Sequence, residues 1–168
     1  MKNAPVLMAL IILMSLGCAS RARAHCEIPC GIYGDEVRFY LLEEHIATIE
    51  KSMNMIAELS AETDVNYNQL VRWIDNKETH AEYFQEIIAQ YFMTQRVKPV
   101  EPDDEHYQSY LEKITLLHRL LIGAMKAKQT TDPETAKELT SLLNRFRTAY
   151  FGARPGEHRL PPESHKDH

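Results

Sequence analysis

The chain has 168 residues, which suits one domain of ordinary size or two very small ones. Its 44% apolar and 26% charged residues make a globular composition rather than a disordered or fibrous one. A net charge of −5 argues against a basic nucleic-acid-binding surface, and three cysteines are too few for a scaffold held together by disulfides.

Residues 1–24 have the pattern of an export signal that is removed from the mature protein. Lys2 supplies a positive start, residues 6–16 form an apolar run too short to span a bilayer, and the Ala-Arg-Ala of residues 22–24 matches a small-x-small cleavage site. Two arginines close to the cut leave open a maturation protease other than a signal peptidase. Cleavage removes three cations and no acid, so the net charge shifts from −5 to −8, and His25 gains a free α-amine. We therefore expect an exported protein, periplasmic or extracellular, without a membrane segment in its mature form.

Residues 35–151 have the apolar spacing of four amphipathic helices and almost no strand alternation. The predicted helices are residues 35–59, 66–94, 103–128 and 132–150. Their apolar stripes are Leu42, Ile46, Ile49, Met53 and Ile56; Leu70, Ile74, Ala81, Phe84, Ile88 and Tyr91; Tyr107, Tyr110, Ile114, Leu117, Leu121 and Ala124; and Ala136, Leu139, Leu143, Phe146 and Tyr150. Lys77 is the one polar residue on the second stripe. Short links make successive helices antiparallel, so we expect an all-α, up-down four-helix bundle.

Local signals indicate where these helices begin and end. Asp132 before Pro133 combines a capping carboxylate with a proline suited to a first helical turn. The two prolines within residues 98–102 cannot continue a helix, and Asp103 or Asp104 can cap the helix that follows.

The composition changes after Phe151. Residues 152–168 carry three prolines and many charges, and we expect an extended tail. Its three histidines can bind metal weakly, although a solvated tail explains them as well; they are His158, His165 and His168.

Between the leader and the first helix lies a compact polar segment, residues 25–34, here called the hook. In the mature chain His25 offers its α-amine and its ring, Cys26 its amide nitrogen and sulfur, and Cys30 a second sulfur. Amine, amide and Cys26 sulfur form two fused five-membered chelate rings, which favour a planar arrangement. Pro29 can bend the chain so that Cys30 closes the fourth corner. Planar nitrogen and sulfur ligation indicates nickel or copper rather than tetrahedral zinc, with the His25 ring as a fifth, axial ligand.

These residues resemble a known family. The pattern His25-Cys26-x-x-Pro29-Cys30-Gly31-x-Tyr33, directly after a removable leader, is similar to the start of the nickel superoxide dismutases. A four-helix domain of suitable length follows, and the Gln-Tyr-Phe of residues 90–92 leads into a proline-containing link as in that family. The resemblance covers essentially the whole mature chain apart from the longer tail.

The resemblance implies an activity and a ligand set. Family members hold one nickel ion per subunit through the counterparts of His25, Cys26 and Cys30, and nickel alternates between its divalent and trivalent states. Two superoxide radicals and two protons become dioxygen and hydrogen peroxide. Tyr33 corresponds to the tyrosine that screens the substrate approach, and Glu27 to an acid that orders the pocket. The family assembles as a homohexamer of four-helix bundles.

The chain departs from the family where the axial histidine is held. Well-known members use a glutamate on the first helix and an arginine on the second, and these positions fall near Tyr40 or Leu41 and near Asn76. None of the three residues matches. The charged candidates to replace them are Glu43, Glu44 and Arg72.

Other interpretations remain beside the catalytic one. Cys26 and Cys30 can form a disulfide or bind zinc, and the same hook would serve an exported copper or nickel carrier without turnover. A purely structural bundle would not need the cysteines. Tyr91 fits both a place in the core and a place beside the metal. Four histidines in the predicted helices show no ligand spacing and are expected at the surface or in satisfied core positions; they are His45, His80, His106 and His118.

Overall fold

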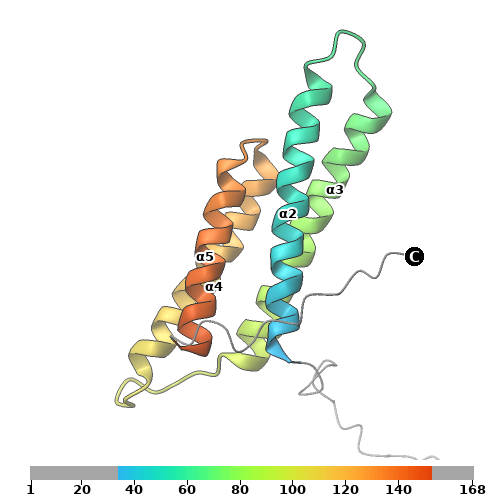
Figure 1. Ribbon diagram of the computed structural model, residues 1–168. Helices are drawn as coiled ribbons and strands as arrows, with labels where there is room; N and C mark the ends of the chain where they lie inside the picture. Colours follow the sequence, from blue (N-terminus) through green and yellow to red (C-terminus); the bar gives the residue numbers. More distant parts are fainter. Residues whose placement is uncertain (1–33, 153–168) are drawn as a thin grey trace, which may run out of the picture. The chain divides into compact units, whose positions relative to one another are not determined.

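The computed structural model describes residues 34–152, and this part of the chain is all helical (Figure 1). Its elements in chain order are α2 (Asp35–Ser60), α3 (Tyr67–Glu86), η1 (Ile87–Arg96), α4 (Tyr107–Gln129) and α5 (Glu134–Phe151). Helix α2 packs against α3 and α5, and α4 packs against α3 and α5, so each helix has two neighbours. The expected up-down four-helix bundle is confirmed, and η1 continues α3 as its last turns.

The first predicted helix is confirmed almost to the residue. Asn66 caps the second, since its Oδ1 accepts from the backbone N–H of Gln69 at 3.2 Å. The third helix begins at Tyr107, four residues later than expected, because Asp104 accepts from the His106 N–H at 2.7 Å in a turn ahead of the helix. Asp132 acts as predicted, accepting from the Glu134 N–H at 3.0 Å.

The buried stripes of α2 and α5 agree with the sequence prediction. On α3 and α4 some predicted residues are exposed or only half-buried, for reasons that the packing of the helices explains. All five predicted residues of α2 are buried, as are four of the five in α5. On α3, Ile74 is 40% exposed, because the α2–α3 hairpin extends beyond the turn between α4 and α5 and only α2 covers it there (Figure 1). Helix α4 faces two neighbours and buries two adjacent lines of residues; they are Leu116, Leu117, Leu120, Ala124 and Ala127. The other predicted residues of α4 are half-buried at its margins.

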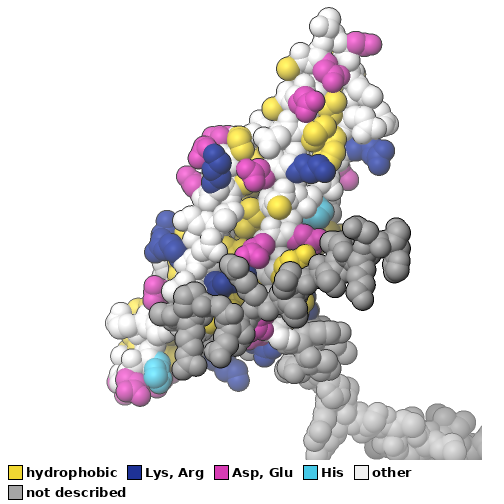
Figure 2. All heavy atoms as spheres, in the orientation of Figure 1, with side chains coloured by type: hydrophobic (Ala, Val, Ile, Leu, Met, Phe, Trp, Pro, Cys, Tyr) yellow, Lys and Arg dark blue, Asp and Glu magenta, His cyan; other side chains and the backbone are white. Residues whose placement is uncertain are grey.

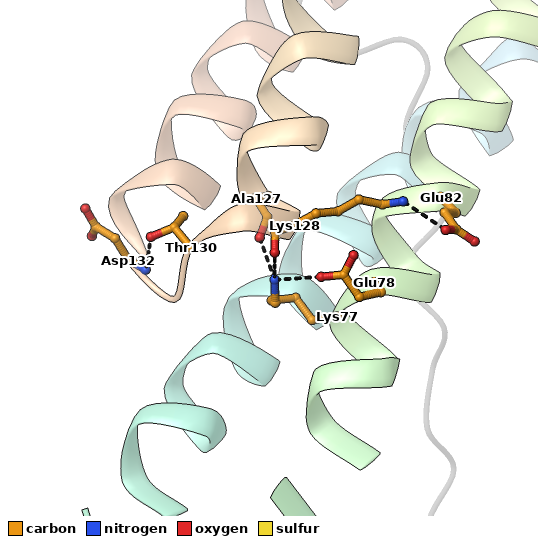
Figure 3. Close-up of polar contacts among 7 residues, drawn as sticks. All are labelled: Lys77, Glu78, Glu82, Ala127, Lys128, Thr130 and Asp132. Atoms are coloured by element: carbon orange, nitrogen blue, oxygen red, sulfur yellow. Dashed lines mark hydrogen bonds and ion pairs between the residues drawn. The ribbon is translucent and has the colours of Figure 1, made fainter. Parts of the chain in front are cut away.

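Lys77, the polar residue on the second stripe, is 4% exposed and caps another helix. Its Nζ donates to the carbonyl of Ala127 at 2.9 Å and to that of Lys128, and it pairs with Glu78 at 3.0 Å (Figure 3). These carbonyls belong to the last turn of α4, whose dipole favours a cation. The ammonium therefore satisfies groups that the C-terminus of α4 would otherwise bury without partners.

No helix within residues 34–152 combines the length and the apolar character that crossing a membrane requires.

Candidate metal centre

The predicted metal ligands His25, Cys26 and Cys30, and the predicted gate Tyr33, lie outside the described residues. The described chain begins at Gly34, which directly follows Tyr33 and is the N-cap of α2. The start of α2 is therefore the fixed end to which the hook is covalently attached.

Asp35, the first residue of α2, is the centre of a cluster of four polar side chains. Its members, here called the Asp35 cluster, are Asp35, Tyr91, Arg96 and Tyr150. The Tyr91 hydroxyl donates to Asp35 Oδ1 at 2.5 Å, and the Tyr150 hydroxyl donates to Oδ2 at 2.8 Å. Arg96 Nε lies 2.9 Å from Oδ1, and another guanidinium nitrogen of Arg96 donates to the Tyr91 hydroxyl at 2.7 Å. Both carboxylate oxygens are thus engaged, and the start of α2 is tied to η1 and to the end of α5.

The π-helical geometry of η1 makes this cluster possible. In a π-helix each N–H bonds to the carbonyl five residues earlier, so residues i and i+5 lie one turn apart. Tyr91 and Arg96 have this spacing, and both can therefore reach Asp35. The side chains of Thr94 and Gln95 likewise bond to carbonyls five residues earlier, at 2.8 and 3.1 Å. The consecutive residues Tyr91 and Phe92 of η1 are both buried.

The two hydroxyls of the cluster stay protonated at neutral pH. Burial, and next the hydrogen bond to Asp35, raises the pKa of Tyr91, and the same two causes raise the pKa of Tyr150 further. Each hydroxyl therefore acts as a donor to Asp35 over the physiological range.

Aromatic rings pack beneath the cluster. The rings of Phe39, Phe92 and Phe146 are fully buried, with centroids 5.0–5.4 Å apart. Phe39 lies one helical turn after Asp35, so the polar cluster rests directly on the core. Tyr91 takes part in both layers, since its ring contacts Phe92 with centroids 5.2 Å apart. Its core role is thus confirmed, while its place beside a metal stays a prediction.

Three guanidinium groups gather at the same end of the bundle. Those of Arg38 and Arg96 lie over the ring of Tyr91, at 5.0 and 4.8 Å from its centroid, and that of Arg147 lies 5.0 Å from the centroid of Phe39. Two of these charges are balanced by carboxylates, since Arg96 pairs with Asp35 and Arg147 with Glu43.

The positions expected to orient the axial histidine hold other contacts. Tyr40 is 53% exposed, and Asn76 donates to the hydroxyl of Ser52 at 2.9 Å across α2 and α3. Among the candidate replacements, Glu43 pairs with Arg147 at 2.6 Å. Glu44 and Arg72 are exposed.

The fold also joins two histidines that the sequence keeps 35 residues apart. His45 Nδ1 on α2 lies 3.0 Å from His80 Nδ1 on α3, a contact that sequence spacing did not reveal, whereas His106 and His118 are exposed as expected. Within residues 34–152 no group of three or more His, Cys, Asp or Glu side chains could hold a metal ion.

Comparisons with known proteins point to one family. The family model described as nickel-containing superoxide dismutase matches residues 20–154, a span that includes the hook and the four helices. A superoxide dismutase [Ni] from Streptomyces seoulensis is 28% identical over 122 residues, which cover 70% of this chain and 79% of that protein. No solved structure matches the chain.

Proposed function

The chain belongs to the nickel-containing superoxide dismutase family, and from that premise we propose that its hook, once freed by cleavage after Ala24, holds the catalytic nickel ion. The reaction converts two superoxide radicals and two protons to dioxygen and hydrogen peroxide. The observation that carries the proposal is the hook motif itself, which begins directly after the predicted cleavage site. The motif also lies inside the span that the family model matches.

The donor set fits one nickel ion per subunit. His25 would supply its α-amine and a ring nitrogen, Cys26 its amide nitrogen and sulfur, and Cys30 a second sulfur. Two thiolates and an anionic amide donate strongly, which favours nickel over harder ions and stabilises its higher oxidation state. When bound, nickel supplies the one-electron chemistry by alternating between the divalent and trivalent states.

Residues of the bundle would position the hook and attract the substrate. The Asp35 cluster fixes the start of α2, five residues after Cys30, so the hook leaves the bundle from a rigid end. Tyr33, near the end of the hook in the chain, would screen the approach of substrate. Of the three guanidinium groups at this end, that of Arg38 would draw the superoxide anion, because Arg96 and Arg147 pair with Asp35 and Glu43.

Export and assembly complete the proposal. Residues 1–24 would direct the chain to the periplasm or the exterior, where a maturation protease frees His25. We further propose a homohexamer, as the family resemblance implies. Three exposed apolar residues on one face of α3 support assembly through the bundle; they are Tyr67, Val71 and Ile74, at 71%, 62% and 40% exposure.

The test begins with mass spectrometry of the native N-terminus, which should start at His25. Protein in this form should bind one nickel per chain, dismute superoxide and give a trivalent-nickel resonance split by an axial nitrogen. Cys26→Ser and Cys30→Ser should abolish nickel binding and activity, whereas His118→Gln, a substitution at an exposed site on α4, should preserve both.

Three results would contradict the proposal. They are a mature chain that begins elsewhere, harmless cysteine substitutions, and nickel bound without dismutation, which would indicate a carrier protein.

A further inference from the structure

We propose that His45 and His80 form a second metal-ion site, between α2 and α3, that takes a divalent ion of tetragonal geometry, with copper(II) preferred. The site uses none of the hook residues and does not depend on the proposed function. Its two ring nitrogens come from different helices, and the bundle brings them together.

The separation of the two nitrogens fits a shared ion. With metal–nitrogen bonds of about 2.0–2.1 Å, two nitrogens 3.0 Å apart subtend roughly 95° at the ion. A tetrahedral ion would need the nitrogens roughly 3.3 Å apart, because its ligand angle is near 109°. The observed separation is closer to the right angle between neighbouring ligands of copper(II) or nickel(II).

The surroundings leave room for ligands from solvent. Both rings are half-buried, their centroids are 5.1 Å apart, and their planes meet at 67°, so the two Nδ1 atoms converge instead of the ring faces stacking. Tyr83 follows His80 by three residues, lies with its ring centroid 5.8 and 6.0 Å from the two imidazoles, and is 49% exposed. Because both rings are only half-buried, water would complete the coordination of an ion held here, beside the Tyr83 phenol.

The type of donor selects the ion. Neutral imidazoles bind copper, nickel and zinc, and affinity for a given nitrogen site is highest for copper(II) among the divalent ions of this series. Burial, and next the proximity of His80, lowers the pKa of His45, which keeps its lone pair available near neutral pH. The hook has two sulfur donors and this site has none, so the two places differ in the ions they favour.

A hydrogen bond between the two rings is the competing explanation, because 3.0 Å also suits an N–H···N contact. The two explanations differ in stoichiometry. A hydrogen-bonded pair stabilises the bundle without changing how many ions the chain binds.

The experiment titrates copper(II) into the full chain carrying Cys26→Ser and Cys30→Ser, which removes both hook thiolates. In this background, His45→Gln and His80→Gln should each lower the number of tightly bound copper ions by one and remove a tetragonal copper resonance with imidazole nitrogen splitting. The matched control is His118→Gln, a lone exposed histidine on α4, which should leave both unchanged. Circular dichroism before titration confirms that each variant is folded.

Two outcomes would overturn the proposal. Equal copper stoichiometry in all three variants would leave the pair as a hydrogen bond only. Zinc binding at this site at least as tight as copper would refute the tetragonal assignment.

Discussion

The Asp35 cluster makes a quantitative prediction, because one carboxylate holds three partners from two other elements. Replacing Asp35 by Ala removes the acceptor of two hydroxyl donors, at 2.5 and 2.8 Å, and the partner of Arg96 at 2.9 Å. Hydrogen bonds to a charged group contribute about 1.5–3 kcal/mol each. The carboxylate is 25% exposed, so the lower end applies, and the ion pair adds little beyond the hydroxyl bonds. We expect Asp35→Ala to lower the free energy of unfolding by about 3 kcal/mol.

The assay is urea and thermal unfolding followed by far-ultraviolet circular dichroism. A loss of this size corresponds to a melting temperature roughly 10 °C lower for a domain of this length. Asp35→Asn keeps the size but not the charge, and about half the loss is expected. Asp75→Asn, at an exposed position on α3, is the matched control and should change stability by less than about 0.5 kcal/mol.

The reasoning fails if Asp35→Ala and Asp75→Asn have equal effects. A double-mutant cycle between Asp35 and Tyr150 supplies the second check, with an expected coupling of about 1 kcal/mol. Additive losses would mean that the observed hydroxyl bond contributes nothing measurable.

Three further outcomes follow from the bundle. Lys77→Met should lower the free energy of unfolding by about 1–3 kcal/mol, measured by urea denaturation, because the last carbonyls of α4 lose their donor; an unchanged midpoint would contradict the capping role. Gly123→Ala should destabilise by about 1 kcal/mol net, since a Cβ there would lie 2.7 Å from Cδ2 of the fully buried Leu139, and that overpacking outweighs the gain in helix propensity; a higher melting temperature would contradict it. The raised pKa values of Tyr91 and Tyr150 make the unfolded chain ionise first, so stability should be complete below about pH 10 and fall as pH rises further; Tyr150→Phe should flatten this loss in urea titrations between about pH 8 and 11, and an unaltered profile would exclude Tyr150 as a cause.

The buried faces of the helices show which features a local sequence pattern can predict. The predicted buried stripe of α2 was correct, because the alternation of apolar and polar residues along the sequence defines both faces of a long amphipathic helix. The α4 stripe was only partly correct, because burial there depends on two neighbours at once. The predicted burial of Ile74 was wrong, because this residue lies on the part of α3 that only α2 covers. The surface of the bundle in Figure 2 shows hydrophobic side chains toward this end of the hairpin.

The candidate site likewise has a part that the sequence predicted and a part that it did not. The ligand set of the hook could be read from sequence, because its donors lie within six consecutive residues and chelate geometry depends on the bonds between them. The Asp35 cluster could not, because its members lie up to 115 residues apart and meet only when the helices pack. The π-helix also escaped prediction, since its stripe resembles that of an ordinary helix; the signal available was the Tyr91–Arg96 spacing.

The sequence by itself determined the four helices, the family resemblance and the candidate ligands, since each depends on residues close together in the chain. Only the tertiary structure decided that Asp35 ties the start of α2 to η1 and α5, that Lys77 caps α4, and that His45 contacts His80. These contacts depend on how far each helix rotates against its neighbours, and that angle is set by the packing of the whole core rather than by any single segment.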